Sequence, residues 1–247
     1  MIDIDILWED ANYVAISKPA RLAAIPGRGE KVNAFEQVAQ RIGLPHRGNS
    51  DARLRLLHRI DKDTSGILLF ARNKTAQRHV SHQFQNNQVT KEYLALVAGR
   101  PYQDQGDIDA PMARHPSSPQ KMAVARHGRP ARTLWKVEDY LGDFTLLRVF
   151  PKTGKTHQIR VHLKSIGLPL AIDPLYNPKG QQAIYLSSFK RGYRKGSDEE
   201  RPLISRLTLH AEKLTFKNLD GTTVELAAPL PKDFRAALNM LRKYARG

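Results

Sequence analysis

The chain has 247 residues, 40% of them hydrophobic, no cysteine, and 40 lysines and arginines against 24 acidic residues. This length and apolar content suit one large domain or two lobes and exclude a wholly disordered chain. The lack of cysteine excludes disulfide scaffolds and thiolate metal sites. The formal net charge of +16 favours a polyanionic partner, with nucleic acid ahead of an anionic membrane surface.

Nothing in the sequence indicates a membrane or secretory protein. No apolar stretch approaches the roughly 20 residues that a transmembrane helix needs. The N-terminus reads MIDID, which is acidic and alternating, unlike a signal or transit peptide. We therefore expect a cytoplasmic protein without a membrane partner.

The first third of the chain is expected to hold short elements separated by loops. Alternating apolar residues over 4–16 predict a strand that Pro19 stops. Helical spacing of apolar residues predicts helices over 34–42 and 75–85. The expected loops are the basic segment 25–31 and the polar segment 44–53.

The remainder of the chain is rich in predicted strands. They are expected over residues 91–97, 133–137, 144–150, 158–163, 208–216 and 223–226. A hairpin at Gly142 joins the second and third of these strands, and a turn at Gly221 precedes the last. A helix over 233–244 closes the chain. Many strands with a few helices favour an α+β fold with a mixed, largely antiparallel sheet.

Residues 187–206 resemble an inserted basic loop. The segment 189–196 reads FKRGYRKG, which combines positive charge with Tyr193. That pattern suits contact with an RNA backbone and stacking of a base on the ring. The alternative is a solvated charged excursion without a ligand.

The densest polar motif lies at residues 58–66, which read HRIDKDTSG and continue into the apolar run ILLFA. An apolar run bounded by a turn signal predicts a buried strand, so the charged residues ahead of it are held near the core. Asp61 is the foremost catalytic candidate, because a carboxylate acts as a nucleophile or as a base. An ion-paired structural aspartate is the alternative, and it is the favoured interpretation for Asp63.

A second motif lies at residues 152–163, which read KTGKTHQIRVHL. Interpreted as a strand, its alternating apolar residues face the core, and Arg160 lies on the opposite face, toward solvent or a cleft. His157 and His162 would then point to opposite faces of the strand. One ion could not bind both imidazoles, so we expect no metal site.

Together these motifs resemble those of the RluA-type RNA pseudouridine synthases, which isomerise uridine in RNA. Residues 58–71 are similar to the signature HRLDxxTSGLLLFA, and 153–163 to TGRTHQIRVHL, with Lys155 in place of the more common arginine. Residues 91–97, KEYLALV, are similar to KxYLALV. Weaker likenesses lie at 14–22, 170–177 and 209–211.

The resemblance implies a pseudouridine synthase catalytic fold in two subdomains with an RNA-binding cleft between them. It implies one catalytic domain over residues 1–247, without a separate N-terminal RNA-binding module. The partner would be RNA, either tRNA, 23S-type ribosomal RNA or both, with no DNA and no cofactor. The oligomeric state stays open, with a monomer favoured.

The resemblance also implies roles for single residues. The aspartate matched by Asp61 attacks the ribose or removes a ribose proton, and the arginine matched by Arg160 pairs with that aspartate. The tyrosine matched by Tyr93 stacks under the target base, although a core aromatic is the alternative. Arg59 would fill the space that a flipped nucleotide leaves. The expected substrate-binding residues are Arg59, His58, Thr64, Lys155, Gln158 and Tyr193.

Three further assignments keep alternatives, and so does the function. Arg59 could only grip phosphate, Arg160 could be an exposed surface arginine, and His58 could form a local hydrogen bond or pack in its loop. One rival function is a catalytically silent RNA-binding or ribosome-assembly protein with the same fold. The other is a metal-dependent RNA hydrolase built on His58, Asp61 and Asp63.

Overall fold

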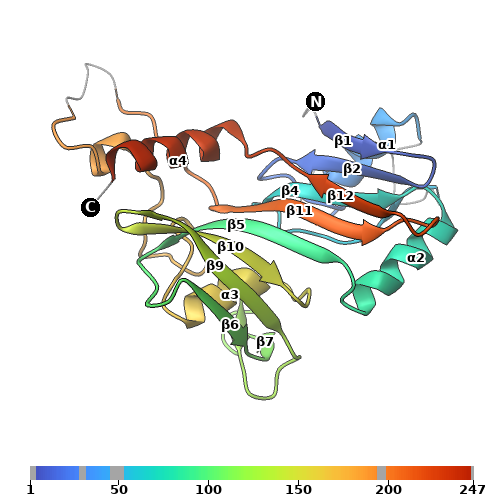
Figure 1. Cartoon of the computed structure of the whole chain (residues 1–247), viewed down its shortest axis with the longest axis horizontal. Helices are drawn as coiled ribbons and strands as arrows, with labels where there is room; N and C mark the ends of the chain where they lie inside the picture. The colour runs from blue at the N-terminus through green and yellow to red at the C-terminus, as the bar shows by residue number, and fades with distance from the viewer. Residues whose placement is uncertain (1–3, 28–31, 45–52, 194–198, 246–247) are drawn as a thin grey trace. The chain divides into compact units, whose positions relative to one another are not determined.

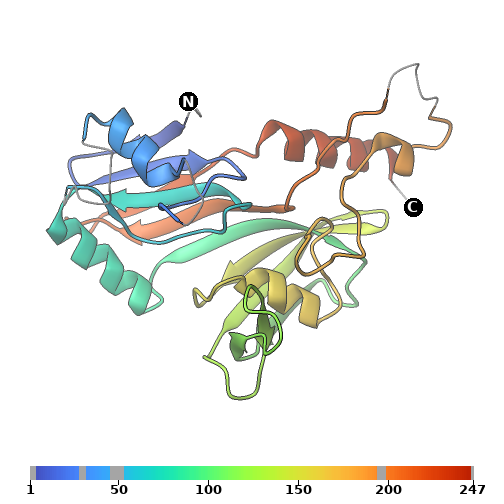
Figure 2. The same ribbon diagram turned by 180° about the vertical axis from the view of Figure 1, so that it is seen from behind.

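The computed structural model describes residues 4–27, 32–44, 53–193 and 199–245. The chain divides into two compact units (Figures 1 and 2). The first comprises Met1–Glu92 and His210–Pro229, and the second comprises Tyr93–Leu209 and Leu230–Gly247. Both units are therefore built from separate stretches of the chain.

The first unit is a mixed sheet with a helix on each face (Figure 1). Its strands are β1 (Asp5–Glu9), β2 (Tyr13–Lys18), β3 (Arg55–Leu56), β4 (Ser65–Ala71), β11 (Leu209–Lys217) and β12 (Thr223–Ala227). They pair in the order β1-β2-β4-β11-β12, and β3 pairs with β4. The β4–β11 pair is parallel, while the other pairs are antiparallel.

Alternation along β2 decides which helix covers which face of this sheet. Val14 and Ile16 pack with α1 (Ala34–Arg41), whereas Tyr13 and Ala15 pack with α2 (Lys74–Gln85). Neighbouring side chains of a strand point to opposite faces, so the two helices lie on opposite sides. Every residue of β4 is buried, as expected for a central strand covered on both faces.

The second unit repeats this arrangement with an antiparallel sheet (Figure 2). Its strands pair in the order β5 (Thr90–Ala98), β10 (Phe144–Pro151), β9 (Arg132–Leu141) and β6 (Gln105–Asp109). The short strands β7 (Met112–Arg114) and β8 (Met122–Val124) pair separately. The helical elements are α3 (Gln158–Ser165), the 3-10 turn η1 (Leu186–Ser188) and α4 (Lys232–Tyr244).

Alternation along β5 again separates the two helices. Leu94 and Leu96 pack in the cluster that contains α4 residues, whereas Ala95 and Val97 pack in the cluster that contains α3 residues. The two helices therefore cover opposite faces of this sheet.

Most of the predicted elements are confirmed. The helices expected over 34–42, 75–85 and 233–244 are α1, α2 and α4. The hairpin at Gly142, with φ of +66°, joins β9 to β10 as expected. The strand expected over 4–16 is instead a hairpin of β1 and β2. The short strands β6, β7 and β8 were not predicted.

The strand predicted over residues 158–163 is wrong, because this segment forms α3. All six of these residues are buried, polar and apolar alike. A short segment that is buried on every side shows no amphipathic period. The spacing of its apolar residues therefore does not distinguish a strand from a helix. Arg160 accordingly lies in the interior of the second unit, only 7% exposed, and the alternative of an exposed surface arginine does not hold.

Parts of the expected loops lie outside the described residues, namely 28–31, 45–52 and 194–198. At the base of the inserted segment, Ile184 and Ile204 form an isolated antiparallel bridge, and both are buried. No helix within the described part of the chain has the length and apolar character needed to cross a membrane.

Gly66 offers a test of the parallel β4–β11 pair. Its φ is +118°, and a Cβ added here would collide with the backbone of Ala211. We expect Gly66→Ala to lower the free energy of unfolding by about 2–4 kcal/mol, through strain and through separation of the two strands. Urea denaturation measures this change.

Gly167→Ala is the matched control, because Gly167 also has a positive φ, +78°, with nothing within 4 Å of the added Cβ. It should lose only about 1 kcal/mol. Equal losses of unfolding free energy in the two variants would contradict a structural role for the close contact between Gly66 and Ala211.

Candidate active site

Asp61 lies on a tight turn that leads directly into β4. The Thr64 N–H donates to the Asp61 carbonyl at 3.1 Å, and the next two residues, Lys62 and Asp63, are exposed. The Asp61 side chain is half-buried. The buried strand therefore fixes the backbone of Asp61, whose carboxylate lies at the edge of the core.

A buried lysine supports this turn. Lys18 is 0% exposed, and its Nζ donates to the carbonyls of Pro19, Leu22 and Lys62 at 2.8–2.9 Å. These bonds use the three donors of the ammonium group, which offsets the cost of burying its charge. Because Lys62 follows Asp61 directly, Lys18 anchors the turn that carries the candidate carboxylate.

His58 packs against β4 as a neutral imidazole. Its Nε2 accepts a hydrogen bond from the Leu69 N–H at 3.1 Å, and its ring stacks on Phe84 at 5.1 Å between centroids. Burial, assisted by the positive charge of Lys91, lowers the pKa of His58 to about 3. These contacts are those of the alternative interpretation, a local hydrogen bond in a packed loop. They also occupy one nitrogen that a metal ion would need.

Three further predicted site residues remain. Arg59 and Thr64 lie close to Asp61 in the sequence, and Tyr93 lies on β5. Arg59 is exposed. Thr64 is 2% exposed, and its Oγ1 has no hydrogen-bond partner among the described residues. Tyr93 is half-buried on β5, opposite Val149 of β10, and packs against the cluster that α3 shares. The tyrosine therefore has one part in a core and another part accessible.

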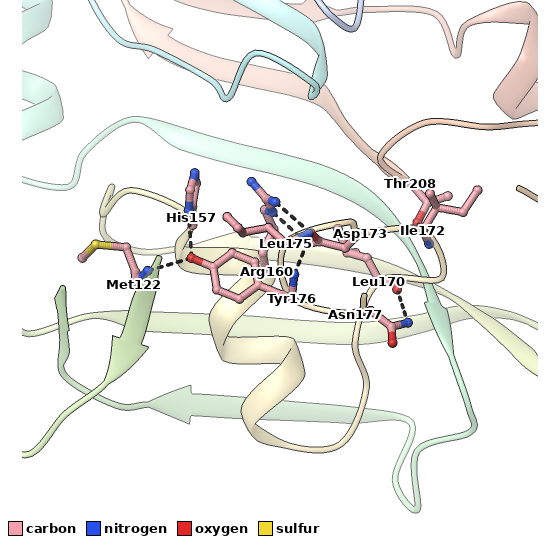
Figure 3. A network of polar contacts seen from close by, with 10 residues as sticks. All are labelled: Met122, His157, Arg160, Leu170, Ile172, Asp173, Leu175, Tyr176, Asn177 and Thr208. Carbon is pink, nitrogen blue, oxygen red and sulfur yellow. Dashed lines mark hydrogen bonds and ion pairs between the residues drawn. The ribbon is translucent and has the colours of Figure 1, made fainter. Parts of the chain in front are cut away.

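In the second unit, Arg160 forms a buried ion pair with Asp173 (Figure 3). The arginine Nε and Nη2 donate to the two carboxylate oxygens, each at 2.8 Å. Oδ1 of Asp173 also accepts the N–H groups of Leu175 and Tyr176 at 3.0 Å. Asp173 is 1% exposed. The expected pairing of Arg160 with Asp61, which belongs to the other unit, stays a prediction.

Tyr176 adds a second contact to the same guanidinium. The Arg160 Cζ lies 4.9 Å from the centre of the tyrosine ring. The Tyr176 hydroxyl accepts a hydrogen bond from the Met122 N–H of β8 at 2.8 Å and lies 2.8 Å from Nδ1 of His157 (Figure 3). A chain of contacts thus runs from β8 through Tyr176 to Arg160.

Gln158 uses its amide entirely within the protein. Its Oε1 accepts from the Thr153 hydroxyl and the Lys155 N–H, and its Nε2 donates to Arg132 O and Thr133 Oγ1. Two acceptor sites and two donors are thereby satisfied. These bonds fix the shape of the loop before α3, and the predicted contact of Gln158 with substrate stays a prediction. The Lys155 side chain is half-buried at this loop.

The two histidines of this motif have separate partners. His157 has a φ of +56° ahead of α3 and bonds to Tyr176. His162 lies within α3, with Nδ1 near Thr133 Oγ1 and Nε2 near Ala110 O. Their separation follows from these partners and not from the alternation of a strand. The described residues contain no group of three or more His, Cys, Asp or Glu side chains placed to hold a metal ion.

Tyr193 lies in a basic aromatic cluster. The Nζ of Lys190 is 5.9 Å from the centre of the Tyr193 ring and 4.7 Å from that of Tyr244, near the end of α4. Lys243 lies 5.2 Å from the Tyr244 ring. The structure thus brings the inserted segment and the end of the last helix together, a neighbourhood that the sequence did not predict.

Lys18, Asp173 and Tyr176 were not among the predicted site residues. All three stand in the weaker motif likenesses, at 14–22 and 170–177, which were the available signal. A charged residue in such a motif indicates a role in the site only when its partners are known. These partners come from other parts of the chain, so the sequence alone does not show them.

The neutral state of His58 gives a pH prediction. The unfolded chain binds a proton at this histidine near pH 6.5, whereas the folded chain does so only near pH 3. Stability is therefore present above pH 6.5 and falls as the pH drops below it, by up to about 1.4 kcal/mol per pH unit. We expect His58→Gln, which keeps an acceptor for the Leu69 N–H, to flatten this slope in urea unfolding between about pH 6 and 4.

The control is His127→Gln, since His127 is exposed. It should leave the slope of the wild type unchanged. Identical slopes in the wild type and in His58→Gln would show that His58 is not held neutral.

Known proteins resemble this chain over nearly its whole length. The family model for RNA pseudouridylate synthase matches residues 12–165. An uncharacterized RNA pseudouridine synthase, YlyB of Bacillus subtilis, is 37% identical over 98% of this chain and 74% of its own length. The ribosomal large subunit pseudouridine synthase D of Nitrosomonas europaea is 37% identical over 98% of this chain and 66% of its own.

The solved structure of human RNA Pseudouridylate Synthase Domain Containing 4 has the same fold. It superposes with a TM-score of 0.70 at 25% identity and covers 96% of this chain and 93% of the human one. The match to the family model includes both the turn that carries Asp61 and the whole of α3, which carries Arg160. This chain belongs to the RNA pseudouridylate synthase family, whose members are isomerases acting on RNA.

Proposed function

We propose that this enzyme converts specific uridines of large-subunit ribosomal RNA to pseudouridine, with Asp61 as the catalytic carboxylate. The observation that supports this role most directly is the turn at Asp61, which the Thr64 N–H, the Lys18 ammonium and the buried strand β4 hold in place. A fixed, half-buried carboxylate suits nucleophilic or base chemistry. The choice of RNA follows the names of relatives; tRNA is the second candidate.

The reaction moves the bond between base and sugar without a change in oxidation state. The C1′–N1 bond of uridine breaks, the uracil turns, and a C1′–C5 bond forms while the proton at C5 leaves to water and N1 takes up a proton. Asp61 begins this sequence in one of two ways. It attacks C1′ and is later displaced by C5, or it removes a ribose proton that is returned after the base rejoins. Neither route consumes an oxidant or a reductant.

We assign the supporting roles to three residues. Tyr93 offers a ring in the first half of β5 on which the turning base stacks. Arg59, which is exposed, fills the space that the flipped nucleotide leaves, and so offsets part of the few kcal/mol that flipping costs. Arg160 keeps the catalytic carboxylate ionised and oriented. Within the motifs at 58–66 and 152–163, the Thr64 hydroxyl and the Lys155 ammonium are the remaining candidates for RNA contact. Outside these motifs, the candidates are Tyr193 and Lys190.

The first prediction concerns Asp61. Asp61→Asn keeps the size of the side chain and removes its nucleophilic and basic character. With ribosomal RNA transcripts carrying tritium at C5 of uridine, the wild type should release tritium to water, and Asp61→Asn should lower this rate by a factor of at least about 10⁴.

Asp63→Asn is the matched control, because this carboxylate is exposed two residues away on the same turn. It should keep the wild-type rate. Release by Asp61→Asn at the wild-type rate would overturn the catalytic role. Tight RNA binding without release by the wild type, on ribosomal RNA, tRNA and ribosome-assembly particles alike, would favour the silent RNA-binding protein.

The second prediction concerns salt. The chain carries a net charge of +16, so its RNA contacts include phosphates whose counterions are released on binding. With a slope of about 0.7 per phosphate contact on single strands, about three contacts weaken binding about 20-fold between about 50 and 200 mM salt. Filter binding over this range measures the slope, and a flat plot would contradict it. Asp61→Asn should keep the same slope.

A further inference from the structure

We propose that Asp173 and Tyr176 are positioning residues for Arg160, and that the Tyr176 hydroxyl links the position of the guanidinium to strand β8. This proposal rests on the proposed function, in which Arg160 acts on the catalytic carboxylate. Neither residue belongs to the motifs that carry Asp61, Tyr93 and Arg160.

Asp173 fixes the plane of the guanidinium. Two parallel hydrogen bonds of 2.8 Å hold the Nε–Nη2 edge, so the group cannot rotate within its plane without losing one of them. The carboxylate is itself held by the backbone N–H groups of Leu175 and Tyr176. Because Asp173 is 1% exposed, water does not replace these partners easily.

Tyr176 limits movement in the remaining direction. Its ring lies against the guanidinium at 4.9 Å, and it is packed in a buried cluster with Met112, Ala131 and Val161. The hydroxyl accepts from the Met122 N–H, which leaves its own proton for Nδ1 of His157 when that nitrogen is unprotonated. The ring therefore cannot tilt away from Arg160 without breaking its bond to β8 (Figure 3).

The structure allows the two parts of this contact to be separated. Tyr176→Phe keeps the ring over Arg160 and the packing in the cluster, but removes the hydroxyl that fixes the tilt of the ring. A displacement of about 1 Å at a catalytic group can cost a factor of about 100 in rate. A role confined to folding would instead appear as lost stability with an unchanged rate in the folded fraction.

The experiment measures tritium release under single-turnover conditions with saturating enzyme, together with the dissociation constant for the same RNA. Tyr176→Phe should slow release about 10-fold, keep the dissociation constant within about twofold, and leave an intact cooperative thermal transition. Tyr140→Phe is the matched control. It removes the same atom in the same unit, from a hydroxyl that donates to Asp104, and should keep the wild-type rate.

A double-mutant cycle tests whether the effect passes through Arg160. Arg160→Lys keeps the charge and removes the planar, paired geometry. On that background Tyr176→Phe should change the rate by less than about twofold, because the group that it positions is gone. Asp173→Asn should likewise slow the wild type but not the Arg160→Lys variant.

Each of the opposite outcomes would overturn a specific part of the proposal. A wild-type rate for Tyr176→Phe, or equal slowing on both backgrounds, would overturn the positioning role. A wild-type rate for Arg160→Lys would overturn the role of Arg160 and with it this proposal, while leaving the role of Asp61 intact. The absence of release by the wild-type enzyme would overturn the proposed function itself.

Discussion

The buried ion pair of Arg160 and Asp173 is the interaction around which its neighbourhood in the second unit is organised. Removing two charges from water costs several kcal/mol for each, and the protein compensates only if the remaining donors and acceptors are also satisfied. The backbone N–H groups at Leu175 and Tyr176 and the Tyr176 ring meet this demand. The turn after Asp173, α3 and β8 are thereby linked through one pair of charges and the ring beside it. Loss of one partner alone would cost about 3–5 kcal/mol.

Local signals in the sequence were sufficient for three of the four α-helices among the described residues. α1 and α2 begin at Asn33 and Asn73, whose side chains accept the N–H three residues later, and both present one apolar face to a sheet. α3 has no such contrast between faces. Its polar residues Gln158, Arg160 and His162 are buried with partners from other elements, and only the folded chain supplies those partners. The helix was therefore predicted as a strand.

The sequence predicted the candidate catalytic residues better than it predicted the residues that hold those side chains in place. Asp61, Tyr93 and Arg160 lie in long, specific stretches of sequence. Lys18 binds backbone carbonyls, and Asp173 binds backbone N–H groups in addition to Arg160. Every residue possesses such backbone groups, so residue types carry no information about these contacts. A sequence indicates a reactive group more readily than the scaffold that orients it.

The parallel contact of Gly66 with Ala211 has a consequence for biosynthesis. β4 and β11 are separated by more than half of the chain, and β11 is made only after the whole second unit except α4. A growing chain that has just produced the Asp61 turn therefore lacks one neighbour of its central strand. Contacts of such long sequence separation form slowly, and the uncovered strand edge is prone to wrong pairing in the meantime. The N-terminal part of the first unit, residues Met1–Glu92, is thus expected to wait, incompletely folded, until translation is nearly finished.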